Sequence, residues 1–192
     1  MNVRKRVVGS IFAAGLVGLT AAWVRSAPIM GQAKAKVTDS ILSVGRIDTI
    51  RLDIRPMPDD MAALGITTDS VRNRWSKALE RANMRVLAAD DDAEAVGTLK
   101  LSVASGVDEE ASPDAVLCYL LLSFQQPVRL DRFERSLFVP TYYKVIADIT
   151  PKDALEVSLN DNLNFLVEHF ITHARKADRW WISVGQGAPD GR

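Results

Sequence analysis

The sequence has little of the covalent chemistry that stabilises many small exported proteins, because only one of its 192 residues is cysteine. A single cysteine excludes an internal disulfide. This residue, Cys118, lies far from the N-terminal apolar segment, so we expect no lipid-modified cysteine there. Cys118 alternates with apolar neighbours, a pattern that favours a small core residue over a reactive thiol.

Recognised catalytic patterns are also missing from the sequence. There is no Gly-x-Ser-x-Gly nucleophile elbow and no Ser-x-x-Lys motif. The two histidines lie four residues apart, which leaves little room for a dispersed catalytic triad. The stretch Gly185-Gln186-Gly187 follows no buried strand and opens no helix, so it is not a dinucleotide loop. The sequence predicts no enzyme, no catalytic residue and no cofactor.

Neither sign of charge is in excess, since 24 basic residues balance 24 acidic ones. The balance conceals an asymmetry, because residues 1–35 contain five basic residues and no acidic one. The rest of the chain carries 19 basic against 24 acidic residues, a net charge of −5. Nucleic-acid binding requires a basic face that neutralises phosphates. We therefore expect no nucleic-acid partner.

What the sequence does have is an N-terminal apolar run behind a basic start. Positions 4–6 read Arg-Lys-Arg, and Val7–Val24 follows with 18 uncharged residues. This pattern is typical of a signal peptide or signal-anchor whose N-terminus stays in the cytoplasm. As a helix the run spans about 27 Å at about 1.5 Å per residue, close to the thickness of a membrane core. Small-residue cleavage sites end at Ala22 and Ala35, so cleavage and retention both stay open, with retention slightly favoured over cleavage.

The remaining sequence alternates between strand and helix patterns. Apolar residues recur at every second position in five segments and at helical spacing in two. In the fifth strand segment the odd positions from Val139 to Ile149 are the expected buried face. The predicted strands are Ile47–Arg55, Met84–Ala88, Thr98–Ser105, Ala115–Val128 and Leu137–Ile149, and the predicted helices are Thr67–Asn83 and part or all of Pro151–Ala177.

These elements predict an α+β fold: a two-layer sandwich preceded by an N-terminal apolar helix. We expect a mostly antiparallel sheet of about four to five strands with two helices on one face, because the later connections are short. Residues 1–35 are the predicted signal peptide or signal-anchor and linker. Residues 36–180 are the predicted exported domain, and residues 181–192 are a predicted flexible tail.

Three groups of residues are candidate sites. His169 and His173 share one helix face and would supply two ligands of a zinc site, but no third ligand follows, so surface or flanking positions are favoured. Asp90–Glu94 and Asp108–Glu110 lack the glycine and distal glutamate of a calcium loop, and they predict solvated turns. Trp180 and Trp181 either pack back over the sheet or form an exposed aromatic patch. No metal site is predicted.

Residues 46–177 resemble a family of small periplasmic envelope domains, the lipopolysaccharide-assembly lipoproteins. The resemblance lies in the order and spacing of the stretches IDTIRLDI, TDSVRNRWSKALERANMRVL, GTLKLSVAS, AVLCYLLLSF and LNDNLNFLVEHFITHARKA. It implies an accessory domain that works beside or inside an outer-membrane partner. The family's lipoprotein cysteine is missing here, so its lipid anchor is not carried over, and no functional residue is transferred.

Together these patterns predict a non-enzymatic envelope protein that acts through protein–protein contacts. We expect envelope protein partners, membrane attachment through Val7–Val24 if the segment is uncleaved, and a domain on the periplasmic side. The alternative is a module for a small ligand or lipid, in which the two helices splay from the sheet. Trp75, Tyr142 and Tyr143 would then lie near an apolar groove.

Overall fold

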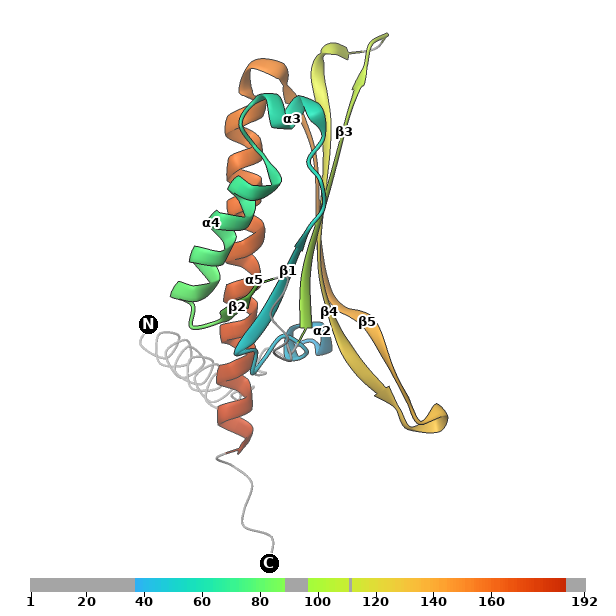
Figure 1. Ribbon diagram of the computed structural model, residues 1–192, viewed down its shortest axis with the longest axis vertical. Helices are drawn as coiled ribbons and strands as arrows, with labels where there is room; N and C mark the ends of the chain where they lie inside the picture. Colours follow the sequence, from blue (N-terminus) through green and yellow to red (C-terminus); the bar gives the residue numbers. More distant parts are fainter. Residues whose placement is uncertain (1–36, 89–96, 111, 186–192) are drawn as a thin grey trace, which may run out of the picture. The chain divides into compact units, whose positions relative to one another are not determined.

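The computed structural model describes residues 37–88, 97–110 and 112–185, and from Val37 onward the chain forms one compact unit (Figure 1). The predicted leader Val7–Val24 and the acidic stretch Asp90–Glu94 lie outside these residues. None of the described helices is both long and apolar enough to cross a membrane. In chain order the elements are α2 (Asp39–Leu42), β1 (Thr49–Ile54), α3 (Asp59–Ala63), α4 (Thr68–Arg81), β2 (Arg85–Leu87), β3 (Gly97–Asp108), β4 (Ser112–Leu130), η1 (Asp131–Phe133), β5 (Arg135–Pro151), η2 (Lys152–Ala154) and α5 (Leu155–Gly185).

The five strands form one sheet in the order β2-β1-β3-β4-β5. The predicted meander is confirmed for β3, β4 and β5, which pair antiparallel. The expectation of a mostly antiparallel sheet is wrong for the other half, since β1 runs parallel to both β2 and β3. The helix α4 accounts for this difference, because a crossover of that length returns the chain in the same direction as β1. The sheet is therefore mixed.

The two long helices cover one face of this sheet, as the sequence predicts (Figure 1). The side chain of Thr67 accepts a hydrogen bond from the backbone N–H of Ser70, and the Ser70 hydroxyl accepts one from the Thr67 N–H. This reciprocal cap fixes the start of α4. Asn83 ends it with a left-handed φ of 64°. The predicted apolar stripes of both helices are in the core, which includes fully buried Trp75 and Phe170.

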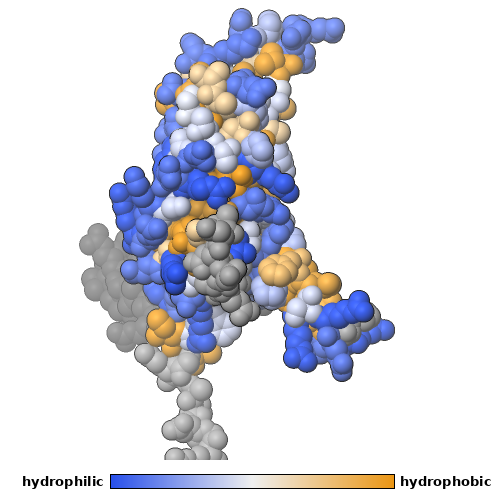
Figure 2. All heavy atoms as spheres, in the orientation of Figure 1, coloured by the Kyte–Doolittle hydropathy of each residue, from blue (hydrophilic) through white to orange (hydrophobic). Residues whose placement is uncertain are grey.

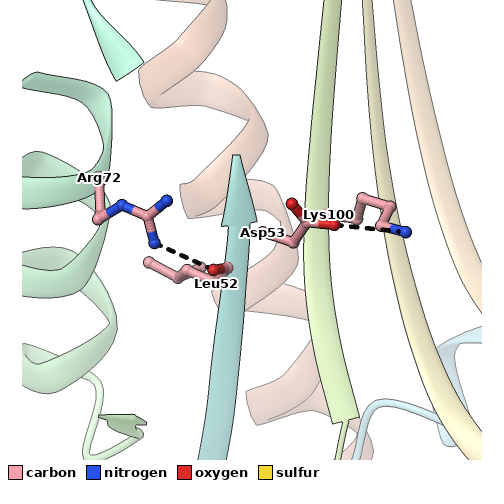
Figure 3. A network of polar contacts seen from close by, with 4 residues as sticks. All are labelled: Leu52, Asp53, Arg72 and Lys100. Atoms are coloured by element: carbon pink, nitrogen blue, oxygen red, sulfur yellow. Dashed lines mark hydrogen bonds and ion pairs between the residues drawn. The ribbon is translucent and has the colours of Figure 1, made fainter. Parts of the chain in front are cut away.

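Polar contacts on β1 show how the two faces of the sheet differ (Figure 3). On the helix side, the Arg72 guanidinium donates to the backbone oxygen of Leu52 at 3.1 Å and ties α4 to β1. On the opposite side, Lys100 of β3 pairs with Asp53 of β1 at 3.4 Å. The Leu52 side chain is buried under the helices, and successive side chains of a strand point to opposite faces, so Asp53 and its partner Lys100 mark the uncovered side.

The helix α5 extends beyond its predicted C-terminal end. It begins at Leu155, after the short helix η2, and continues to Gly185. Residues 181–185 therefore belong to the helix and not to the predicted flexible tail. Trp181 explains the extension, because its contacts with the segment before β1, described below, hold the last turns of α5 in place.

The predicted buried face of β5 is wrong. Tyr143 and Ile149 of the odd positions are 72% and 70% exposed, whereas Tyr142 is buried against α5. The register decides the matter: Phe124 of β4 pairs with Tyr142, and both side chains point toward the helices. The more apolar side of β5 thus faces away from the protein's own core.

Candidate interaction surface

An apolar strip runs along the uncovered side of β4 and β5. We call it the open face. It is built from cross-strand pairs: Leu117 lies opposite Ile149, and Leu121 opposite Val145. Side chains in such pairs lie close enough to form a continuous surface. The large side chains of the open face that are clearly exposed are Leu117, Tyr119, Tyr143, Val145 and Ile149.

The neighbouring strands on the same side are polar. There β1 presents Asp53 and β3 presents Lys100 and Ser102, which lies opposite Leu121 of β4. The apolar strip is therefore confined to β4 and to β5, the outermost strand of the sheet. The backbone of an edge strand also presents unpaired N–H and C=O groups, which natural proteins usually protect. The open face thus lies partly on an edge strand of the sheet.

Beyond the body, β4 and β5 continue as a two-stranded hairpin that stands away from the helices (Figure 1). We call residues 125–140 the arm. It begins where the register shifts between Phe124 and Gln125, a bulge that bends the ladder. The Gln126 amide secures this bend, donating to the Ser43 backbone oxygen at 3.2 Å and to the Thr141 hydroxyl at 3.0 Å.

The arm is apolar along its length and charged at its tip (Figure 2). Phe138 is 68% exposed, and Leu130 and Leu137 are exposed as well. Around η1 the tip carries charges of both signs at residues 129–135, including an exposed pair between Arg129 and Asp131 at 3.7 Å. An isolated two-stranded hairpin is at best marginally stable in water. An arm with exposed Phe138 and Leu137 is therefore suited to being covered.

The structure brings His169 and His173 together against β5, with ring centroids 4.1 Å apart. The Tyr142 hydroxyl and His169 Nδ1 are 2.8 Å apart and share a hydrogen bond. Burial is the main cause that lowers the pKa of both histidines, and the Lys144 ammonium lowers both further. Burial raises the pKa of Tyr142 to about 12. The described residues hold no group of three His, Cys, Asp or Glu side chains able to bind a metal ion.

A second polar cluster joins β5 to the start of α5. One carboxylate oxygen of Asp148 accepts hydrogen bonds from Ser158 at 2.8 Å, from Thr150 at 2.9 Å and from Asn162 at 3.2 Å. The Ser158 bond is the largest cause that lowers the pKa of Asp148. Cys118, a predicted core residue, is the cross-strand partner of Asp148 and is buried. Burial raises the pKa of the Cys118 thiol, which suits a structural role.

Trp181 packs against the segment before β1, and not over the sheet as the first of its two interpretations predicts. Its indole Nε1 donates to the Leu42 backbone oxygen at 3.4 Å, and the Arg46 guanidinium lies 5.2 Å from its ring. The Arg46 backbone N–H donates to the carboxylate of Asp178. Trp180 meets Trp181 edge to face at 4.9 Å and stays half-buried.

The other predicted groups do not form a site. The acidic turn after β3 is exposed, and the Asp108 carboxylate accepts a hydrogen bond from the Glu110 backbone N–H at 3.2 Å. Trp75 and Tyr142 lie inside the core, while Tyr143 faces the other way, so these three do not line one groove. A shallow cavity of about 370 Å³ lies elsewhere, with walls that come from α4, β1 and the region of β2: Leu52, Arg72, Ser76, Glu80, Val86, Leu87 and Ala88.

Sequence reasoning missed the open face and the arm. The signal was present in β4, whose even and odd positions are both largely apolar. Two helices on one face can cover only one of these sides. The bulge at Phe124 and Gln125 had no comparable signal, because it depends on pairing between distant segments.

Comparison with known proteins gives one distant likeness to report. No family model and no curated protein matches the chain. A solved structure of a minor lipoprotein from Acinetobacter baumannii is similar with 15% identity, covering 73% of this chain and 95% of that one, with a TM-score of 0.30. At this TM-score the likeness carries no argument about function. The function proposed below therefore rests on the surface of this chain.

Proposed function

We propose that the protein is a non-enzymatic accessory or scaffold subunit of the cell envelope that acts through protein–protein contacts. Val7–Val24 anchors or exports it, and the domain from Val37 onward lies outside the cytoplasmic membrane. Its partners are envelope proteins. The observation that supports this proposal is the set of exposed apolar side chains on the open face and the arm, which the described helices leave uncovered.

The residues on this surface are of the types that dominate protein interfaces. Phe138, Tyr143 and Tyr119 are exposed aromatic side chains on paired strands. Aromatic residues are enriched among the few interface positions that contribute 2 kcal/mol or more, a rough threshold. Soluble monomers rarely expose a contiguous apolar patch of more than a few hundred Å². A covering protein therefore explains why this surface is apolar.

In-cell photo-crosslinking of the full-length chain tests the proposal. A photoreactive amino acid at Phe138 or Tyr143 is expected to trap the same envelope protein, and one at Val157 is expected to trap none. Val157 is the matched control because it is 66% exposed, equally apolar, and on the helix side of the domain. Identical products from all three positions, or none from the first two, would contradict a contact through this surface.

Co-purification in mild detergent adds a quantitative readout. Phe138→Ser is expected to reduce the recovery of the crosslinked partner about tenfold or more, the factor for a truncated aromatic at the centre of an interface. It leaves the melting temperature unchanged, because the side chain is exposed in the free domain. Val157→Ser is expected to change neither quantity. Equal recovery of the partner with the unchanged protein, Phe138→Ser and Val157→Ser would refute the arm as the contact surface.

The proposed location needs its own measurement. We expect the full-length protein to stay in the membrane after carbonate washing, with an intact mass that retains residues 1–36. A soluble periplasmic protein of lower mass would show that the leader exports the chain and does not anchor it. The proposed contact surface would then be unaffected. A protein found in the cytoplasm would overturn the envelope assignment.

A small-ligand module is the second candidate, supported by the cavity between α4, β1 and β2. Its volume of about 370 Å³ falls near the lower end of the range for ligand pockets. Native mass spectrometry of the purified full-length protein tests this alternative. A bound molecule whose retention is lost with Ala88→Trp, which fills the cavity, would favour it. A protein that carries no such molecule would leave only the interface proposal.

A further inference from the structure

The C-terminal end of α5 combines aromatic, aliphatic and basic side chains. Ile182 and Val184 are 58% and 46% exposed, and Trp180 beside them is half-buried. At 100° per residue Ile182 and Val184 point to different sides of the helix, so its last turn is apolar on more than one side. Hydrophobic residues are visible at this lower end of the domain in Figure 2. We call Lys176, Arg179, Trp180, Ile182 and Val184 the helix tip.

The described chain also begins at this end. Trp181 donates to the Leu42 backbone oxygen, and Asp178 accepts from the Arg46 N–H, so the segment that follows Val37 is held against the last turns of α5. Val7–Val24 is the predicted membrane segment, and 12 residues separate Val24 from Val37. Fully extended, 12 residues reach about 40 Å at about 3.3 Å per residue. A membrane-anchored chain therefore keeps the helix tip close to the bilayer.

The charges at the helix tip suit an anionic surface. Residues 175–185 contain three basic side chains, Arg175, Lys176 and Arg179, and one acidic side chain, Asp178. Asp178 already accepts the Arg46 backbone N–H. On the adjoining segment Asp39 and Asp48 are exposed, as is Arg46. Basic residues near an anionic membrane each strengthen binding, and tryptophan prefers the boundary between headgroups and acyl chains.

We propose that the helix tip docks on the anionic lipid bilayer into which Val7–Val24 inserts. Trp180, Ile182 and Val184 enter the interfacial layer, and Lys176 and Arg179 meet lipid phosphates. This inference rests on the proposed membrane anchor. Docking fixes the orientation of the domain, so that the open face and the arm, which lie on other elements, remain available to a protein partner.

Tryptophan quenching in vesicles tests the docking. The full-length protein, carrying Trp23→Phe to remove the leader indole, is reconstituted into phosphatidylethanolamine–phosphatidylglycerol vesicles with or without brominated acyl chains. Bromine quenches only indoles that reach the acyl chains, so emission is expected to fall by up to about one third, because Trp180 is one of the three indoles that remain. A variant that also carries Trp180→Phe and Trp181→Phe retains only Trp75, which is fully buried. That variant is expected to show no quenching.

Surface variants separate docking from anchoring. Lys176→Gln and Arg179→Gln are each expected to weaken docking about fivefold, the factor for about 1 kcal/mol per basic residue, whereas Arg81→Gln on α4 has no effect. Ile182→Ser with Val184→Ser reduces quenching, and Val157→Ser at the other end of α5 does not. Vesicle flotation without quenching would overturn docking and leave the anchor standing. A protein that does not float with vesicles would overturn both.

Discussion

Two glycines of the same strand, Gly97 and Gly106, provide a stringent test of the packing in this fold. A Cβ on Gly97 would lie 2.5 Å from the Gln125 backbone oxygen and 2.5 Å from Cζ of Phe124. A Cβ on Gly106 would meet nothing within 4 Å. Neither glycine has a positive φ, so space alone distinguishes them. The prediction is that Gly97→Ala destabilises the domain and Gly106→Ala does not.

The magnitude follows from what surrounds Gly97. The Phe124 ring is fully buried and contacts the Phe170 ring with centroids 5.6 Å apart, so it has no free space into which to move. Overpacking of such a core costs about 1–3 kcal/mol, and the contact with a backbone oxygen places Gly97→Ala near the upper end. For a domain of this size that corresponds to a melting temperature lower by about 6–10 °C. Replacing glycine in an open strand position gains about 0.5 kcal/mol.

Urea denaturation of the full-length protein, followed by circular dichroism in the same detergent for each variant, measures both changes. The expected difference between Gly97→Ala and Gly106→Ala is about 3 kcal/mol in unfolding free energy, with unchanged slopes. Equal stability of the two variants would refute the close approach of β3 to the bulge at the start of the arm. That result would also remove the structural basis for the bend.

Three further predictions concern the contacts of α5. Tyr142→Phe leaves the partly buried His169 without its partner, and we expect a loss of about 1–2 kcal/mol in urea denaturation; an unchanged midpoint would contradict this bond. Asp148→Ala removes three hydrogen bonds from a partly exposed carboxylate and is expected to cost about 1–2 kcal/mol near pH 7. Folding lowers the pKa of Asp148, so this cost disappears as pH falls below the ordinary value of 3.8 and through the folded value, and a pH-independent cost would refute the role of the charge. Folding also lowers the pKa of both histidines, so they reduce the stability of the domain already as pH falls below their ordinary value of 6.5. Gly45→Ala brings a Cβ within 2.8 Å of the Trp181 ring. The loss of unfolding free energy that it causes should therefore shrink by about 1 kcal/mol or more when Trp181→Ala is also present, and additive losses in this double-mutant cycle would contradict the contact.

Local patterns in the sequence were sufficient to predict most elements. The helix Thr67–Asn83 is found at Thr68–Arg81 because its cap and its apolar stripe are both local signals. The meander of β3, β4 and β5 follows in the same way from alternation and short connections. The parallel pairing of β1 with β3 was not predictable by these means, since the register between segments some fifty residues apart leaves no local signature.

Site residues were harder to predict because their role depends on which side of a strand is covered. The alternation in β5 identified an apolar side correctly, but the assignment to the core was wrong for Tyr143, Val145 and Ile149. Pairing with β4 decides which side faces the helices, and this information is absent from β5 itself. Trp181 was resolved only by its contacts with Leu42 and Arg46, which are more than a hundred residues away in sequence.

The register of β5 places the more apolar side of the strand on the open face. A shift by one residue would turn Tyr143, Val145 and Ile149 toward the helices and expose Lys144 and Asp148. In water alone that exchange would bury more apolar surface. The observed register is instead held by Tyr142 against His169 and Phe170, and by Asp148, whose carboxylate binds three donors around the start of α5. Specific polar contacts thus hold the less apolar side of the strand on the core and leave its more apolar side on the open face.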